Sequence, residues 1–263
     1  AGEWTAKAAI SNFSRRRSIP GWTFEGRQQN WFSEIAFRRT QNKYFRWVAG
    51  LNYAGDAFQK GQTDSLLFKD FSNHNAGLFG QTAFHRGKLD AELGLRLDWR
   101  TTWGGFALPS AAVLYHFNSN LSFRAGIGVG YSAPNLLNSN DAELDLRRQL
   151  PFQDYLKAER SFGGNVEWNY HHLFGDHFSV DWNQQFFYTR IGTPVVVFEN
   201  SGGQFVWFNE SDPLTTTGLD HYLRMLFKDL ELYLGYTYQD ARRRWNITHP
   251  RVPLTPRHRA AGV

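Results

Sequence analysis

Apolar and polar residues alternate with a period of two along much of the chain. The clearest stretch is residues 89–100, where the two sets separate completely. One set is Leu89, Ala91, Leu93, Leu95, Leu97 and Trp99, and the other is Asp90, Glu92, Gly94, Arg96, Asp98 and Arg100. Successive side chains of a β-strand point to opposite faces, so this pattern predicts a strand with one apolar face and one polar face.

Similar alternation predicts a series of strands along the whole chain. They cover approximately residues 2–12, 29–40, 43–54, 74–85, 88–100, 107–117, 120–132, 159–172, 177–190, 216–227, 230–240 and 256 onward. Most of them are roughly 10 to 13 residues long, whereas strands of soluble proteins average about 5 to 6 residues. Because roughly 9 to 11 residues of tilted strand cross a bilayer, these lengths favour a membrane-spanning sheet.

The connections between the predicted strands alternate between short and long. Short connections fall at residues 41–42, 86–87, 118–119, 173–176 and 228–229. Long connections fall at 13–28, 55–73, 133–158, 191–215 and 241–255, whereas 101–106 is of intermediate length. Short periplasmic turns and long extracellular loops are typical of outer-membrane barrels. We therefore predict an all-β fold, a transmembrane antiparallel β-barrel.

Composition supports this prediction. Aromatic residues make up 17% of the chain, and outer-membrane barrels carry aromatic girdles at both membrane interfaces. No run of about 18 apolar residues exists, so a membrane protein with this sequence must use a closed barrel. The net charge is +5, but the basic residues recur singly within alternating strands, so we expect no nucleic-acid partner.

Three strings of residues carry more specific information. Residues 130–136 read Gly-Tyr-Ser-Ala-Pro-Asn-Leu, residues 156–161 read Leu-Lys-Ala-Glu-Arg-Ser, and residues 253–259 read Pro-Leu-Thr-Pro-Arg-His-Arg. In this order and spacing they resemble the barrel of TonB-dependent outer-membrane receptors. The resemblance covers most of the chain and is weakest before residue 74.

The resemblance implies a barrel of about 22 strands that is closed by an N-terminal plug. About twelve strands are predicted here, so we expect residues 1–263 to be a barrel segment without the plug and without the terminal strands. The resemblance also implies import of a scarce ligand such as a ferric siderophore, haem or cobalamin. The TonB complex, acting through the plug segment, drives such import.

The same resemblance implies a location and a set of partners. The expected location is the outer membrane of a Gram-negative bacterium. The expected partners are outer-membrane lipid, lipopolysaccharide, the TonB complex and a small-molecule ligand such as a metal chelate. No cofactor is expected.

The connections expected on the extracellular side hold the candidate ligand-binding residues. Arginines beside aromatic residues suit anionic ligands, because a guanidinium group binds a carboxylate through two hydrogen bonds. Contact with lipopolysaccharide phosphates is the alternative role for the same arginines. The candidates are Trp103, Arg147, Arg148, Trp207, Arg243, Arg244, Trp245 and His249. The alternative role of Trp103 and Trp207 is a place in the interfacial aromatic belt, and His249 is either a ligand to haem or metal or a solvated loop histidine, the role we favour.

Charged residues on the polar faces of the strands are expected to face the lumen. They are Glu92, Arg96, Asp98, Arg100 and Arg124. We favour pairing across strands as their role, with contact to a plug or to a transport pathway as the alternative. No catalytic motif and no cluster of residues with metal-ligand spacing occurs in the sequence, so we expect neither an enzyme nor a metal site.

Three other functions stay open at this point. A passive porin-like channel of about twelve strands, complete in itself, is the main alternative to active import. An outer-membrane enzyme needs a Ser–His or Asp–His arrangement near one rim, and no predicted strand end displays one plainly. A soluble β-sandwich needs polar outer faces, whereas aromatic faces recur on nearly every predicted strand.

Overall fold

The computed structural model describes residues 2–61, 69–135, 146–253 and 255–263. Leu136 and Leu254, which belong to two of the strings quoted above, lie outside the described residues. The described part consists of a sheet of 12 antiparallel strands, a separate two-stranded hairpin and one single-turn 3-10 helix. This architecture confirms the predicted all-β fold.

The strands of the large sheet are β1 (Gly2–Ile19), β2 (Trp22–Asn42), β3 (Phe45–Lys60), β4 (Phe71–Arg86), β5 (Leu89–Arg100), β6 (Gly104–His116), β7 (Leu121–Ser132), β8 (Glu159–Phe174), β9 (Phe178–Ile191), β12 (Leu214–Phe227), β13 (Leu230–Arg243) and β14 (His258–Gly262). The hairpin consists of β10 (Val195–Glu199) and β11 (Phe205–Asn209), and the 3-10 helix is η1 (Leu146–Arg148). Each predicted strand corresponds to one strand of the large sheet.

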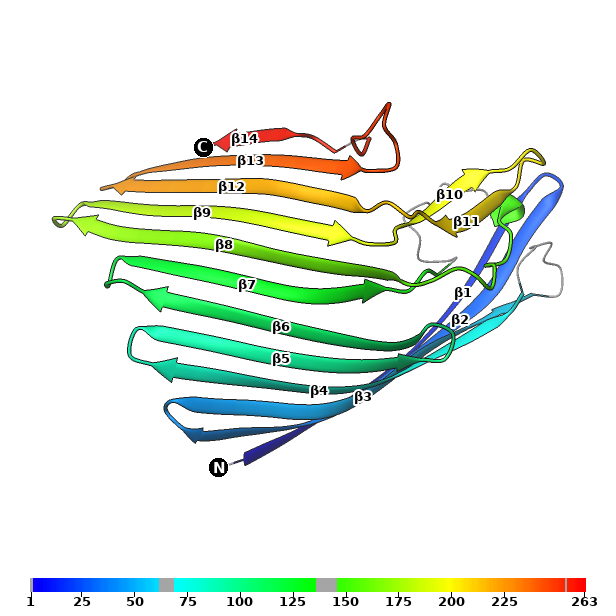
Figure 1. Cartoon of the computed structure of the whole chain (residues 1–263), viewed down its shortest axis with the longest axis horizontal. Coiled ribbons are helices and arrows are strands. Elements are labelled where there is room, and N and C mark those ends of the chain that lie inside the picture. Colours follow the sequence, from blue (N-terminus) through cyan, green and yellow to red (C-terminus); the bar gives the residue numbers. More distant parts are fainter. Residues whose placement is uncertain (1, 62–68, 136–145, 254) are drawn as a thin grey trace.

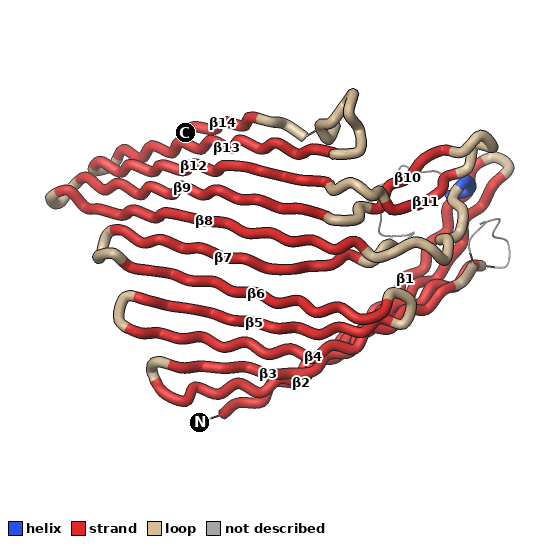
Figure 2. The backbone as a smooth tube through the Cα atoms, viewed as in Figure 1, coloured by secondary structure: helices blue, strands red, loops and turns tan. Residues whose placement is uncertain are grey.

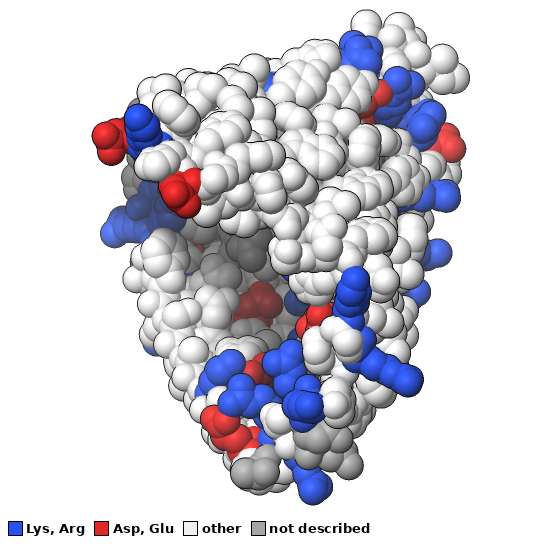
Figure 3. Space-filling view, turned by 90° about the vertical axis from the view of Figure 1, so that its left-hand side faces the viewer, with Lys and Arg blue, Asp and Glu red and all other residues white. Residues whose placement is uncertain are grey.

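The large sheet is strongly curved, and its strands follow one another in chain order (Figure 1). Tight turns gather at one end, which we call the short-turn end (Figure 2). Longer connections, η1 and the β10–β11 hairpin gather at the other end, the loop end (Figure 2). Seen from the short-turn end, the sheet wraps around a hollow, and charged side chains lie along its wall (Figure 3).

The prediction of a long loop at residues 13–28 is wrong. β1 and β2 pair continuously from Gly2 and Arg39 to Ile19 and Trp22, and the chain turns between them at residues 20–21. Gly21 has a φ of 77°, which glycine adopts at little cost. A hairpin end that projects beyond the bilayer needs no apolar face. Apolar and polar residues therefore stop alternating there, and the strands cannot be recognised from the sequence. The predicted loop 191–215 likewise contains the β10–β11 hairpin.

The two faces of the sheet differ as the alternation predicts. Leu95 and Trp99 on β5 are 49% and 66% exposed. Asp98, which belongs to the polar set of the same strand, is only 5% exposed. Large apolar side chains therefore cover the outer, convex face, and polar side chains line the hollow. Such an outer face suits lipid as its surroundings.

Aromatic rings follow the outer face around the short-turn end. Trp4 and Phe37 have ring centroids 4.8 Å apart, and Phe37 and Trp47 have centroids 5.5 Å apart. Phe123 and Trp168, at 5.1 Å, repeat this contact between β7 and β8. These rings form an aromatic girdle of the kind that marks a membrane interface. Among the described residues, no helix is long and apolar enough to span a membrane.

Candidate functional site

An aromatic cluster at the loop end joins segments that are far apart in the sequence. Its buried residues are Phe24 of β2, Phe58 of β3, Leu156 of the β7–β8 connection and Trp207 of β11. Partly buried residues packed against them are Trp22, Phe71, Trp103, Leu146, Phe152, Val195 and Val197. Burial of each large apolar side chain contributes about 1.5–3 kcal/mol to stability. The aromatic cluster therefore acts as a separate hydrophobic core that stabilises the loop end.

Two of the predicted ligand residues, Trp103 and Trp207, belong to this aromatic cluster. Phe152 lies between them, with its ring centroid 6.1 Å from that of Trp103 and 5.6 Å from that of Trp207. Trp207 is only 6% exposed, which makes it a packing residue of the loop core. Trp103 is partly exposed and also lines a cavity, so its ring is available to a ligand.

The single-turn helix η1 carries two more of the predicted residues. Arg148 Nη1 donates to Glu199 Oε1 at 2.9 Å, and its guanidinium carbon lies 4.3 Å from the ring centroid of Phe205. The guanidinium carbon of Arg147 lies 5.7 Å from the ring of Trp22. Arg147 therefore contacts the aromatic cluster through Trp22, and Arg148 ties η1 to the β10–β11 hairpin.

A cavity of about 340 Å³ lies beside the aromatic cluster, and we call it the loop-end cavity. Its lining combines rings with amides, hydroxyls and one ammonium group: Lys69, Phe71, Ser72, Asn73, Thr102, Trp103, Pro134, Asn135, Pro151 and Phe152. Asp56 Oδ2 accepts hydrogen bonds from Asn73 Nδ2 at 3.3 Å and from Asn135 Nδ2 at 3.5 Å. These bonds hold the polar wall of the cavity in position.

Most of this lining is not predicted from the sequence. Of the lining residues, only Trp103 is among the candidates named above, whereas Lys69, Phe71 and Phe152 are not. All three stand in or beside the predicted long loops. An aromatic or cationic residue within or beside a long connection is the signal that points to them.

The remaining candidates lie in the connection from β13 to β14. Arg243 donates from Nη2 to the carbonyl oxygens of His249 and Arg251, each at 3.2 Å, so it shapes this connection. Arg244 and His249 are exposed, and Trp245 is partly buried. None of these residues lines the loop-end cavity, so the described structure separates the candidates into two groups.

Two of the predicted lumen-facing charges, Arg96 and Asp98, meet in one network. Arg96 donates from Nε to Asp98 Oδ1 at 2.8 Å, and its Nη2 lies 3.3 Å from Asn52 Oδ1. Tyr131 Oη donates to Asp98 Oδ2 at 2.9 Å. Asp98 and Asn52 are 5% and 6% exposed, so the network is a buried polar contact between β3, β5 and β7.

Tyr131 in this network departs from the alternation, which places it on the apolar face with Ile127 and Val129. The pairing of β6 with β7 ends at Ser110 and Gly128, so the last residues of β7 no longer follow the ladder with β6. The tyrosine ring stacks on Phe106, with centroids 3.8 Å apart, and its hydroxyl reaches the polar network. The end of the pairing between β6 and β7 thus allows Tyr131 to leave the predicted apolar face and to join the polar network.

The other lumen-facing candidates lie at separate points along the wall. Glu92 Oε2 accepts from Gln81 Nε2 at 3.4 Å. Arg124 stands opposite Glu167 in the register of β7 and β8. Arg100 has a buried Nε without a hydrogen-bond partner in the described part of the chain. Within that same part, no three His, Asp or Glu side chains are arranged to hold a metal ion.

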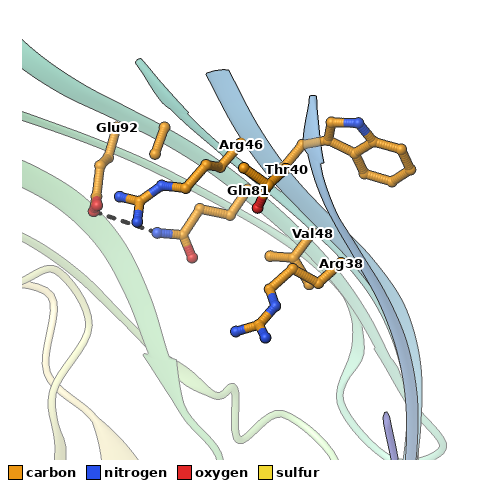
Figure 4. A pocket seen from close by; sticks show the side chains of 8 residues that line it. Arg38, Thr40, Arg46, Val48, Gln81 and Glu92 are labelled. Carbon is orange, nitrogen blue, oxygen red and sulfur yellow. Dashed lines mark hydrogen bonds between the residues drawn. The ribbon is translucent and has the colours of Figure 1, made fainter. Parts of the chain in front are cut away.

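A second cavity, of about 450 Å³, opens on the inner face near the short-turn end. Arg38, Arg46, Gln81 and Glu92 line it from strands β2 to β5 and project to the same side of the sheet (Figure 4). Arg38 also pairs with Glu3 of β1. A lining with this much charge fits water or polar protein groups, and it is unsuited to lipid.

Comparison with known proteins places these features in a family. The family model described as TonB dependent receptor-like, beta-barrel matches residues 2–263. No curated protein sequence matches the chain. Solved structures do match, and the shared feature is their fold.

Three of these structures illustrate the likeness. The siderophore receptor PirA from Pseudomonas aeruginosa aligns with a TM-score of 0.66 and 15% identity over 90% of this chain and 51% of that chain. The FrpB iron transporter from Neisseria meningitidis (F5-1 variant) aligns with a TM-score of 0.72 and 15% identity over 91% and 41%. The Serratia marcescens hemophore receptor HasR aligns with a TM-score of 0.67 and 14% identity over 92% and 49%. This chain therefore spans about half, or less, of the proteins it matches.

Proposed function

Because the chain belongs to the TonB-dependent receptor-like β-barrel family, we propose that it forms part of an active importer in the outer membrane. The family is one of outer-membrane proteins of Gram-negative bacteria, and the named structural neighbours are receptors and transporters. In the proposal, the loop end captures a scarce metal chelate such as a ferric siderophore, and haem and cobalamin are the other candidate ligands. The TonB complex drives import through a plug segment.

The loop-end cavity is the observation that supports ligand capture. Its aromatic rings offer flat apolar surfaces, and Lys69 adds a positive charge beside the amides of Asn73 and Asn135. This combination suits a ligand that has both ring systems and anionic or carbonyl oxygens, which is the chemistry of many metal chelates. The aromatic cluster beside the cavity gives it a packed wall.

A passive channel is the second candidate function. The charged wall of the hollow favours it, because polar solutes cross a membrane through such a lumen (Figure 3). The two functions differ in their need for energy. Import by the proposed receptor stops when TonB is deleted, whereas diffusion through a channel continues.

Uptake in whole cells tests the proposed function. Cells that express the full-length receptor containing this chain are given a panel of radiolabelled ferric siderophores, haem and cobalamin, with and without TonB. We expect TonB-dependent accumulation of at least one of them. Equal accumulation in both strains would favour the passive channel, and accumulation of none of them would contradict import of these ligand classes.

A matched pair of tryptophans tests the cavity itself. Trp103 lines the loop-end cavity, whereas Trp99, four residues earlier, is 66% exposed on the outer face. We expect Trp103→Ala to weaken binding of the transported chelate about tenfold, the loss of one aromatic contact residue, and Trp99→Ala to leave binding unchanged. Equal binding by both variants would show that the ligand bypasses this cavity.

A further inference from the structure

The backbone ladder between β6 and β7 is incomplete. It runs from the short-turn end to Ser110 and Gly128 and stops there, although both strands continue toward the loop end. Beyond this point the two strands diverge (Figure 1). We call the segments that are not paired with each other, residues 104–109 of β6 and 129–132 of β7, the β6–β7 seam.

Pro109 explains where the ladder ends. A proline has no amide hydrogen, so within a sheet it removes one ladder hydrogen bond. Pro109 still pairs with Leu95 of β5, and it is the first residue of β6 beyond the last pair with β7. The missing donor therefore falls on the side of β7.

The seam begins where the outer face stops being apolar. Val129 of β7 pairs with Phe162 of β8, which in turn pairs with Arg190 of β9, an exposed residue. An outward charge marks the edge of the apolar band of a barrel. Lipid cannot satisfy unpaired backbone groups, so the seam lies at a level where water can reach them.

Each side of the seam stays paired with its other neighbour. β6 remains paired with β5 as far as Gly104, and β7 remains paired with β8 as far as Ser132. At the loop end the wall therefore divides into two leaves. The β5–β6 leaf comprises residues 95–109, and the β7–β8 leaf comprises residues 129–135 and 159–162. Because each leaf keeps its own ladder, it can move as a unit.

Side chains, rather than backbone hydrogen bonds, join the two leaves. The ring of Tyr131 stacks on that of Phe106, with centroids 3.8 Å apart and planes 4° apart. The tyrosine hydroxyl donates to Asp98 Oδ2 at 2.9 Å. Arg160 lies with its guanidinium carbon 5.3 Å from the ring of Phe106 and donates from Nη2 to the carbonyl oxygen of Gly105 at 3.5 Å. We call Tyr131 and its partners Phe106 and Asp98 the latch.

The loop-end cavity spans the two leaves. Thr102 and Trp103 line it from the turn of the β5–β6 leaf, whereas Pro134 and Asn135 line it from the β7–β8 leaf. Trp103 also contacts Phe152 of the β7–β8 connection, with ring centroids 6.1 Å apart. Movement of one leaf against the other therefore changes the width of this cavity.

We propose that the β6–β7 seam opens when the latch is released, and that the separation of the two leaves sets the width of the loop-end cavity. A complete ladder would fix β6 and β7 against each other through a row of backbone hydrogen bonds. One ring stack and a few side-chain hydrogen bonds take its place here, and they can break while each leaf keeps its own pairing.

The proposal concerns a movement of the wall and not the identity of a ligand. A seam that stays closed would leave the proposed import intact. Absence of import would likewise leave an opening seam intact, so the two proposals fail separately.

Distances between spin labels across the seam test the proposal. Ala107→Cys and Ser132→Cys place one label on each leaf at exposed positions, and the chain contains no other cysteine. Pulsed electron paramagnetic resonance measures the distance in the purified full-length receptor without ligand, with any cysteine outside this chain replaced. We expect one main distance with the latch intact. In Tyr131→Ala we expect a second population that is longer by one strand spacing, about 4.8 Å, or more.

The paired part of the same two strands supplies the control. Ala111 and Ile127 stand directly opposite each other in the ladder, so labels at these positions should give one distance with and without Tyr131→Ala. An unchanged seam distance in Tyr131→Ala would overturn the proposal. Equal broadening at the seam and at the control pair would also overturn it, because it would indicate that the variant loosens the whole wall.

A milder variant applies if Tyr131→Ala forms no barrel, which heat-modifiable migration reports. Tyr131→Phe keeps the ring stack and loses only the hydrogen bond to Asp98, so we expect a smaller open population than in Tyr131→Ala. Tyr188→Phe is the matched control, because Tyr188 is 40% exposed on the outer face of β9, and it should leave the seam distance unchanged. Identical distances in the two variants would contradict the latch.

Hydrogen exchange of the wild-type receptor tests the seam without any substitution. We expect the amides of residues 104–108 that face β7 to exchange at least about tenfold faster than the paired amides of residues 110–116 on the same strand. Equal protection of the two segments would mean that the seam stays closed, which would overturn the proposal.

Discussion

The barrel wall and the loop-end aromatic cluster are held together in different ways. In the wall, strands pair with their neighbours through backbone ladders, and large side chains such as Leu95 remain 49% exposed on the outer face. In the aromatic cluster, Phe58 and Trp207 are 2% and 6% exposed, although they come from distant parts of the chain. The wall satisfies backbone groups and leaves side chains to the lipid, whereas the cluster buries its side chains.

The surroundings of the two regions explain this difference. Inside lipid, every backbone polar group needs a partner within the protein, so strand pairing dominates. Apolar side chains gain little from each other there, because lipid tails are equally apolar. In water, burial of the same side chains is the main stabilising effect. We therefore expect the loop end to lose most stability when apolar side-chain volume is removed. The wall should lose most stability when a charge is added to its outer face.

Truncation of Trp207 should have the largest effect. Trp207→Ala removes a buried ring that contacts Phe152, and such changes cost about 3–5 kcal/mol. We expect the loop end to open while the wall persists, measured as faster proteolysis within residues 195–209 with unchanged heat-modifiable migration. Phe198→Ala in the same hairpin is the control, because Phe198 is 48% exposed. Equal protease resistance of wild type and Trp207→Ala would mean that the cluster does not hold the loops.

A charge on the outer face tests the wall. Leu95→Arg places a guanidinium group near the middle of β5, where it should cost about 2–4 kcal/mol if lipid surrounds this face. Leu89→Arg is the control at the short-turn end, where the cost falls to about 0–1 kcal/mol. Unfolding in urea from lipid vesicles gives both values for the full-length receptor. Equal costs at the two positions would contradict the membrane-spanning role of β5.

Space around glycines tests the inner face. A Cβ atom at position 77 would collide with the side-chain oxygens of Asn52 and Asp98, so Gly77→Ala should cost about 1–3 kcal/mol. A Cβ atom at position 128, also on the inner face, meets its nearest heavy atom, Ser110 Cβ, at 3.8 Å. Gly128→Ala should therefore change the free energy of unfolding by less than about 0.5 kcal/mol. If the two variants unfold at the same urea concentration, the buried polar network is looser than its contacts indicate.

The wall could be predicted from the sequence because its information is local. A period of two needs only neighbouring residues, and the strand predicted at 88–100 appears as Leu89–Arg100. The prediction fails where lipid no longer imposes that period, as in the β1–β2 hairpin beyond the membrane. It also fails at Tyr131, where the pairing of β7 with β6 has ended and the tyrosine hydroxyl donates to the buried carboxylate of Asp98.

The loop end could be predicted only in part because its contacts are not local. Trp103 and Trp207 are recognisable as loop aromatics, but their shared contact with Phe152 depends on how three separate connections fold together. The same holds for Arg190 and Arg242, which come to lie on the two sides of Thr215 only through the register of β12 with β9 and β13. Residue type identifies such candidates, and three-dimensional structure decides which of them lie together.

Arg148 distinguishes a packing role from a ligand role at the loop end, and it should give the smallest effect on stability. Its ion pair with Glu199 is largely exposed and its contact with Phe205 is a cation–π interaction, so Arg148→Ala should cost about 1 kcal/mol. A double-mutant cycle with Glu199→Gln, read from protease resistance of the loop end, isolates the ion pair. If Arg148 serves only packing, its truncation weakens ligand binding no more than Glu199→Gln does. Binding that falls tenfold in Arg148→Ala alone would instead assign this guanidinium to the ligand, because its pairing with Glu199 cannot account for a loss that the Glu199 variant does not share.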